Sequence, residues 1–204
     1  MKRPPLGLAV AAFLYGAICL TANAVAADLT LAQRDGLKAL RGGDMAKLVV
    51  HDQPRPRIEE SFTDLYGNRI EFADYTGKVV LLNIWATWCP PCRAEMPSLD
   101  RLAGEMAGPD FTVAPLSTDR AGPERVAEFY KDTQVRNLPV LHDRSGKVAR
   151  QAGVLGLPIT LILDRQGREI ARLIGDADWD SPEARTIIEQ VIELTRQADP
   201  IIRT

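Results

Sequence analysis

The fold is decided by one stretch of the chain, Trp85-Ala86-Thr87-Trp88-Cys89-Pro90-Pro91-Cys92-Arg93-Ala94-Glu95-Met96-Pro97. An apolar, β-branched run precedes it and predicts a buried central strand over 79–85. Prolines are tolerated in the first turn of a helix, so Pro90 and Pro91 predict a helix that begins there and ends near Met106. Cys89 therefore lies between a strand and a helix N-terminus, where the helix macrodipole stabilises a thiolate.

Two cysteines separated by two residues are typical of a zinc site, a structural disulfide or a redox-active dithiol. A zinc site needs two further Cys or His ligands, and the chain offers only Cys19, His51 and His142. A structural disulfide across so short a loop would remove little entropy from the unfolded chain. The pattern favours the redox explanation, in which Cys89 attacks a partner and Cys92 resolves the mixed disulfide.

The string from Trp85 to Pro97 resembles the active site of the thioredoxin superfamily. It is most similar to the TlpA branch of exported thiol:disulfide oxidoreductases, neighbours of the cytochrome c biogenesis thioredoxins. The resemblance extends from about residue 57 to about residue 197 and includes Gly156-Leu157-Pro158-Ile159-Thr160. It implies a thioredoxin-like α/β fold, with a mixed central sheet flanked by helices and an N-terminal β-hairpin extension. It also implies exchange with protein disulfides and no cofactor beyond the pair Cys89–Cys92.

The resemblance assigns roles to three more residues. In the superfamily the proline that matches Pro158 is cis and lies against the cysteines, so that the backbone of Leu157 can pair with a substrate. An ordinary trans proline at the start of a strand is the alternative. Glu95 matches a glutamate of the cytochrome c biogenesis thioredoxins and lies three residues after Cys92, on the same helix face. It could accept the thiol proton, whereas a solvated surface glutamate is the alternative.

One position departs from thioredoxin itself. Asn83 stands six residues before the first cysteine, where thioredoxin has a buried aspartate. This change removes the usual proton acceptor and increases the importance of Glu95. Trp88 is expected to shield the thiolate and to contact partners through its apolar ring, together with Pro90 and Pro91.

The composition is that of a soluble globular chain, with 204 residues, 25% of them charged, and a formal net charge of −2. This charge argues against a nucleic-acid partner. Lys2 and Arg3 precede an apolar run and a small-residue stretch that ends near residue 27, which predicts a signal peptide or an uncleaved membrane anchor. Both alternatives place the remainder in the periplasm, because the positive residues stay inside.

The chain divides into four predicted segments: a leader over 1–27, a helical spacer and Pro-rich linker over 28–57, a thioredoxin-like domain over 58–198 and a tail over 199–204. In the spacer we expect helices over 28–40 and 45–50 and an extended connector over 53–57. In the domain we expect a hairpin of strands 58–63 and 69–72, strands over 111–116, 159–163 and 169–174, and helices over 123–131, 146–152 and from about 182 to 197. Four further side chains have an expected place: Trp85 and Trp179 in the core, His142 in an exposed loop, and Asp180 at the N-cap of the last helix.

The proline pair also indicates a redox direction. Neither Pro90 nor Pro91 has a backbone N–H, so the N–H of Cys92 is left to solvate the Cys89 thiolate. A dithiol protein is a strong oxidant when its reduced form is stabilised. Weak solvation of the Cys89 thiolate leaves the reduced form less stabilised. The sequence therefore favours a reductant, with a potential nearer to that of thioredoxin, about −270 mV, than to that of DsbA, about −120 mV.

The resulting hypothesis is an exported, monomeric dithiol reductase of protein disulfides. The TlpA resemblance implies substrates in respiratory cytochrome assembly, either at oxidase copper sites or in apocytochrome c, and a membrane dithiol as electron donor. An oxidant of the same fold is one alternative. A copper-binding dithiol module without turnover is another, and it requires a His or Met ligand near Pro158.

Overall fold

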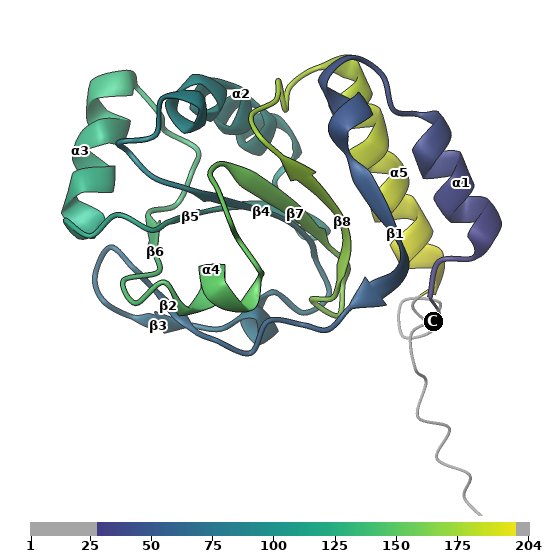
Figure 1. Ribbon diagram of the computed structural model, residues 1–204, viewed down its shortest axis with the longest axis horizontal. Helices are drawn as coiled ribbons and strands as arrows, with labels where there is room; N and C mark the ends of the chain where they lie inside the picture. The colour runs from purple at the N-terminus through teal and green to yellow at the C-terminus, as the bar shows by residue number, and fades with distance from the viewer. Residues whose placement is uncertain (1–27, 199–204) are drawn as a thin grey trace, which may run out of the picture.

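A single mixed sheet carries the site. The computed structural model describes residues 28–198, so the predicted leader and tail lie outside the described residues. Within this range the sheet has eight strands in the order β1-β8-β7-β4-β5-β6-β2-β3 (Figure 1). Its centre is β4 (Val79–Trp85), which pairs in parallel with β5 (Phe111–Ser117) and antiparallel with β7 (Ile159–Leu163). The predicted thioredoxin-like α/β fold is therefore confirmed.

Strand β4 is buried on both faces, which explains its continuous apolar sequence. Its alternate side chains enter two different cores. Val79, Leu81 and Trp85 lie in the larger core, while Leu82 and Ile84 lie in the smaller core on the opposite face. Three helices cover the larger core: α2 (Pro90–Met106), α3 (Pro123–Thr133) and α5 (Pro182–Ala198). Trp85 has no exposed surface, as predicted. Because β4 is paired on both edges and buried on both faces, it fixes the position of the segment that follows it and leads to Cys89.

The remaining elements agree with the sequence patterns to within a few residues. The helices are α1 (Leu31–Ala39), α2 (Pro90–Met106), α3 (Pro123–Thr133), α4 (Lys147–Gln151) and α5 (Pro182–Ala198). The other strands are β1 (Val49–Arg55), β2 (Phe62–Asp64), β3 (Arg69–Ile70), β6 (Leu141–His142) and β8 (Glu169–Ile174), and short 3-10 helices cover Gly43–Lys47 and Phe72–Tyr75. The predicted hairpin is present as β2 and β3, but its strands are shorter than expected.

Residues 28–57, which the sequence predicts to be a helical spacer and a Pro-rich linker, pack against the rest of the domain. Helix α1 lies beside α5, and β1 pairs antiparallel with β8 at the edge of the sheet (Figure 1). Leu37, Met45, Leu48 and Val50 are buried in the larger core. Because this apolar surface is removed from water, the segment contributes to the stability of the domain.

The local elements of this segment also differ from the prediction. The helix expected over 45–50 is a 3-10 helix followed by the start of β1, and the connector expected over 53–57 begins inside the same strand. Pro54 lies in β1, which is an edge strand, and edge strands tolerate proline because one side of their backbone has no partner. The conformation of residues 49–55 is determined by pairing with β8, which lies more than a hundred residues away in the sequence. A pattern within the segment itself cannot predict such a pairing.

The prediction for His142 was wrong. His142 is 2% exposed and lies in β6 rather than in an exposed loop. Its Nε2 atom lies 2.7 Å from the carbonyl oxygen of Asp119, in the segment that follows β5. The strand has only two residues, too few to give an alternating pattern that could be recognised in the sequence.

The predicted cap of the last helix was wrong by one residue. The Ser181 hydroxyl oxygen, not the Asp180 carboxylate, accepts the backbone N–H of Ala184 at 3.2 Å. Asp180 instead forms salt bridges with Arg101 of α2 and Arg185 of α5. Because α5 begins at Pro182, both Asp180 and Ser181 were plausible N-caps. The salt bridges of Asp180 engage its carboxylate elsewhere and leave the capping role to Ser181.

Candidate active site

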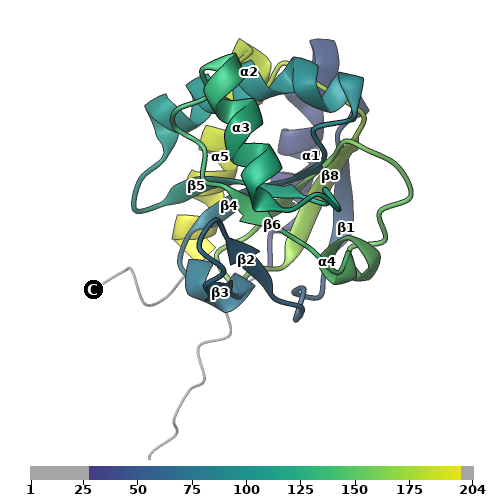
Figure 2. The same cartoon turned by 90° about the vertical axis from the view of Figure 1, so that its left-hand side faces the viewer.

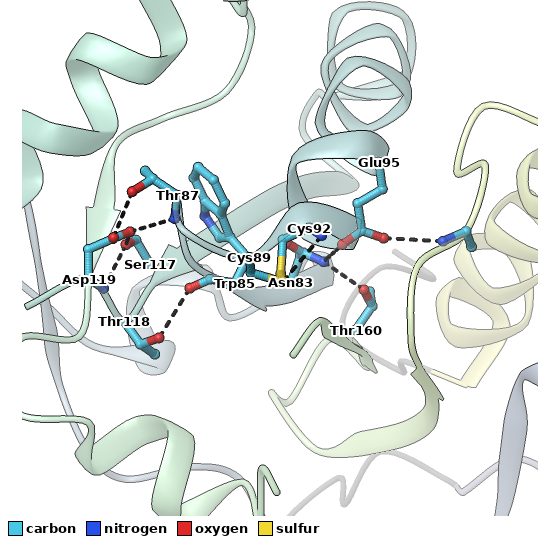
Figure 3. Close-up of a disulfide and its surroundings, with 11 residues drawn as sticks. Asn83, Trp85, Thr87, Cys89, Cys92, Glu95, Ser117, Thr118, Asp119 and Thr160 are labelled. Carbon is cyan, nitrogen blue, oxygen red and sulfur yellow. Dashed lines mark hydrogen bonds between the residues drawn. A yellow bond between two sulfur atoms is a disulfide. The ribbon is translucent and has the colours of Figure 1, made fainter. Parts of the chain in front are cut away.

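The two cysteines of the motif form a disulfide at the start of α2, with an Sγ–Sγ distance of 2.06 Å (Figure 3). Cys89 is the N-cap of the helix, and its sulfur accepts the backbone N–H of Cys92 at 3.3 Å. Pro90 and Pro91 occupy the first helical turn and have no N–H to donate. The position that the sequence predicted for the pair, between β4 and the helix N-terminus, is confirmed.

The two cysteines differ in accessibility. Cys89 retains 4% of its surface and Cys92 retains none. Cys89 is thus more enclosed than its place at a helix N-terminus suggested, and of the two cysteines it alone retains any exposed surface. Trp88, immediately before it, is 67% exposed, and Pro90 and Pro91 are exposed as well. An apolar, solvent-facing surface therefore borders Cys89.

The segment before β7 lies at the same end of the sheet. The peptide bond between Leu157 and Pro158 is cis, as the resemblance implied. Ile159 pairs with Ile84 in β4, which places this segment beside the chain that leads to the disulfide. Pro158 accepts the backbone N–H of Gly175 at 2.9 Å, and Leu157 packs against both cores.

Glu95 is a buried carboxylate one helical turn after Cys92, so the alternative of a solvated surface glutamate is wrong. It is 3% exposed. Its Oε1 accepts the side-chain N–H of Asn83 at 2.8 Å (Figure 3). Its Oε2 accepts the indole N–H of Trp179 at 3.1 Å and the backbone N–H of Ala177 at 3.3 Å. Burial raises its pKa from 4.5 to about 7 and outweighs these hydrogen bonds, which lower it. A carboxyl group with this pKa exchanges protons readily near neutral pH.

Asn83 fixes the position of this carboxylate. It has no exposed surface and donates a second hydrogen bond to the Thr160 hydroxyl at 2.9 Å, across the pair β4–β7. Trp179, predicted only to pack, also donates to the carboxylate. Sequence analysis missed the contacts of Thr160, Ala177 and Trp179 because each lies more than seventy residues from its partner.

A second buried carboxylate holds the loop between β4 and α2. Asp119 is 3% exposed and accepts the backbone N–H of Thr87 at 2.9 Å, the Thr87 hydroxyl at 2.7 Å and the Ser117 hydroxyl at 2.7 Å (Figure 3). These bonds attach the segment just before Cys89 to the end of β5. No local pattern predicted this role, since an aspartate after a strand is common in turns.

Replacing Asp119 with alanine is expected to lower the free energy of unfolding by about 2 kcal/mol, because the buried N–H of Thr87 would lose its acceptor. Denaturant titration of the oxidised protein measures this change. Asp132→Ala, at an exposed position of α3, is the matched control and should change the free energy by less than about 0.5 kcal/mol. Equal effects of the two substitutions would contradict the assigned role of Asp119.

Among residues 28–198, no three or more His, Cys, Asp or Glu side chains are grouped in a way that could hold a metal ion. In the same range no helix combines the length and apolar character needed to cross a bilayer.

Together, the fold and the site define a thioredoxin-like protein with a disulfide at the N-terminus of its active-site helix. The family model described as "AhpC/TSA family" matches residues 52–170, more than half of the chain, and the chain belongs to this family.

Individual relatives agree with this assignment. The thiol-disulfide oxidoreductase ResA of Bacillus thuringiensis subsp. konkukian is 34% identical over 56% of this chain and 65% of that protein. ResA of Oceanobacillus iheyensis is 31% identical over 71% of this chain and 70% of that protein. The crystal structure of the exposed lipoprotein thioredoxin Etrx1 of Streptococcus pneumoniae has a TM-score of 0.56 at 30% identity, covering 65% of this chain and 99% of that one. The match therefore spans less than two thirds of the length of the first of these relatives.

Proposed function

We propose that this protein is a thiol–disulfide oxidoreductase that reduces disulfides of protein substrates. The observation that carries the proposal is the arrangement of Cys89, Cys92 and Glu95: a cysteine that retains 4% of its surface, a fully buried partner bonded to it, and a buried carboxylate one turn further along α2. Resemblance to proteins named thiol-disulfide oxidoreductases supports the same chemistry.

The reaction proceeds in two exchanges. The Cys89 thiolate attacks one sulfur of the substrate disulfide, forms a mixed disulfide and releases the other substrate sulfur as a thiolate. Cys92 then loses its proton to Glu95 and attacks the Cys89 sulfur, which re-forms the Cys89–Cys92 disulfide and releases the second substrate sulfur. The substrate gains two electrons and, with two protons, leaves as a dithiol, while the protein is oxidised by two electrons. A membrane dithiol donor then returns these electrons.

The direction of exchange follows from how the Cys89 sulfur is solvated. The backbone N–H of Cys92 reaches this sulfur, and the two prolines between the cysteines offer none. The reduced form is therefore weakly stabilised, which favours a reductant. A redox titration against glutathione is expected to give a potential closer to about −270 mV than to about −120 mV. A value near the second figure would identify an oxidant instead.

The proposed setting is the periplasm, with residues 1–27 acting as the export signal or the anchor. The proposed partners are proteins of respiratory cytochrome assembly, namely oxidase copper-site factors or apocytochrome c. The protein acts as a monomer, with no cofactor beyond its own cysteine pair and no nucleic-acid partner. The TlpA-like motif supports this setting, and the similarity to proteins named thiol-disulfide oxidoreductases supports the exchange chemistry alone.

Substitution of Cys92 by alanine tests the proposed function. The reduced variant can still attack through Cys89 but cannot resolve, so it should accumulate covalent adducts with its substrates. Mass spectrometry after expression in a bacterial periplasm identifies them, and a reducing agent should release them. Cys89→Ala is the matched control and should trap nothing. Equal trapping by the two variants, or none by either, would contradict the proposed mechanism.

A further inference from the structure

A cavity reaches the buried side chain of Glu95 from the surface of the domain. It has a volume of about 280 Å³ and lies between α2, the segment that joins β8 to α5, and the 3-10 helix Gly43–Lys47. Helix α2 and the start of α5 lie at the same end of the molecule (Figure 2). Because a water molecule in the liquid occupies about 30 Å³, the cavity has room for several. Neither cysteine lines it.

The lining residues show that the cavity is open to solvent on one side. Glu95 lines it and is only 3% exposed. Four other lining residues, one on the 3-10 helix, one on α2 and two before α5, are exposed: Asp44, Ala94, Asp176 and Asp178. The cavity therefore joins a buried carboxyl group to the protein surface by a path that does not pass the disulfide.

Asp176 is tied to Glu95 through the backbone. The peptide N–H that follows it, that of Ala177, donates to Oε2 of Glu95 at 3.3 Å. The carbonyl oxygen of Asp176 accepts the ammonium group of Lys47 at 2.6 Å, and Lys47 also pairs with Asp44 at 3.7 Å. The carboxylate of Asp176 itself forms no hydrogen bond or salt bridge with any other residue of the range 28–198.

The other charged side chains around the cavity have partners of their own. Asp44 accepts the backbone N–H of Asp178 at 3.0 Å, and Asp178 accepts that of Asp180 at 3.1 Å. Arg101 pairs with Asp180 at 2.7 Å. Within the described part of the chain, Asp176 is thus the exposed acidic group of the cavity whose charge is left without a bonded partner.

The groups that contact Glu95 from other elements are neutral. They are the amide of Asn83 on β4 and, before α5, the indole of Trp179 and the backbone N–H of Ala177. Burial is the largest cause that raises the pKa of Glu95 to about 7, and the charge of Asp176 raises this pKa as well.

We propose that this cavity is the route by which Glu95 exchanges its proton with solvent, and that Asp176 is a positioning residue whose charge holds the proton on Glu95. During resolution the Cys92 thiol gives its proton to the Glu95 carboxylate. A water molecule in the cavity then takes this proton and carries it to the bulk as a hydronium ion, which restores the carboxylate. The inference rests on the proposed function, since it concerns the proton acceptor of the same reaction.

The test titrates Glu95 directly, in the oxidised protein, by NMR of its isotope-labelled carboxyl carbon. The signal is identified by its loss in Glu95→Gln. Asp176→Asn removes one charge at constant shape, so the titration midpoint should fall by about half a pH unit, less at high salt. Asp176→Glu keeps the charge and should keep the wild-type midpoint. Ala94→Leu suits the helix and displaces water from the cavity, so the midpoint should rise by about half a pH unit.

Asp132→Asn is the matched control. It removes the same charge at an exposed position of α3 that does not line the cavity, and it should keep the wild-type midpoint. Unchanged midpoints in Asp176→Asn and Ala94→Leu, or an equal shift in Asp132→Asn, would overturn the inference and leave the exchange reaction intact.

A kinetic measurement connects the titration to the reaction. In each variant, the pH profile of mixed-disulfide resolution by the reduced protein should move in the same direction as the NMR midpoint. A profile that stays in place while the midpoint moves would overturn the role of Asp176 in the reaction. Midpoints that move as expected in a protein that reduces no disulfide would support the link between the cavity and Glu95 and overturn the proposed function.

Discussion

Replacing Glu95 with glutamine is expected to slow resolution of the mixed disulfide roughly 100-fold, the effect typical of losing a positioned general base. The attack by Cys89 should keep its wild-type rate, because Glu95 lies beyond Cys92 along α2. In the wild type, the resolution rate should rise as pH increases through about 7, because burial raises the pKa of Glu95 to about 7 and only its ionised form can accept the thiol proton. In the variant this rise should disappear.

Stopped-flow mixing of the reduced protein with a chromogenic disulfide separates the two steps. Glu105→Gln is the matched control: Glu105 lies on the same helix, but its side chain is 60% exposed and pairs with Arg185. The control should resolve at the wild-type rate. If Glu95→Gln also resolved at that rate across the pH range, Glu95 would have no part in the proton transfer.

The local sequence was sufficient to predict those elements whose conformation depends only on their own residues. The apolar run of β4 and the two prolines at the start of α2 placed the cysteine pair correctly to the residue. Both signals act over a few neighbours: burial on two faces selects apolar residues, and a fixed proline φ suits the first helical turn. The cis bond before Pro158 was predicted only because the surrounding residues resemble a known family.

The polar support of the site could not be predicted in the same way. Thr160 reaches the site from β7, Trp179 from the segment before α5, and Asp119 from the segment after β5. Each of these contacts depends on strand order, which a single sequence does not specify. The edge strand β1 was missed for the same reason, since the strand that it pairs with lies at the other end of the domain.

The change at position 83 shows how such support can replace a catalytic group. The resemblance indicates that thioredoxin itself carries a buried aspartate at this position of β4. Here Asn83 donates to Glu95, so the strand supplies a hydrogen-bond donor and the acid comes from α2. The amide also donates to Thr160, and the two bonds together hold the carboxylate at one place between β4 and α5. The proton acceptor is thus proposed to be moved, rather than lost.

The free energy of unfolding is expected to fall by about 3 kcal/mol between pH 4.5 and 7 because of Glu95 alone. Burial raises the pKa of this carboxyl from 4.5 to about 7 in the folded protein, so the folded chain binds more protons than the unfolded chain over this range. Stability therefore decreases as pH rises from 4.5 and becomes constant with respect to this group above about 7.

Glu169 has the opposite effect on stability, and it acts at lower pH. Burial raises the pKa of its carboxyl, but hydrogen bonds from His51 and Arg172 outweigh burial and lower the pKa below its usual value. The stabilising contribution of Glu169 is therefore lost as pH falls below 4.5.

Denaturant titrations of oxidised wild type and Glu95→Gln at several pH values measure this contribution as a difference, in which all other titrating groups cancel. The variant should gain stability relative to the wild type as pH rises from 4.5 to 7, because its neutral amide is never forced to ionise in a buried site. Glu105→Gln, exposed on the same helix, should run parallel to the wild type. Parallel curves for Glu95→Gln would show that the carboxyl ionises at its ordinary pKa, and would remove the physical basis for its role as proton acceptor near neutral pH.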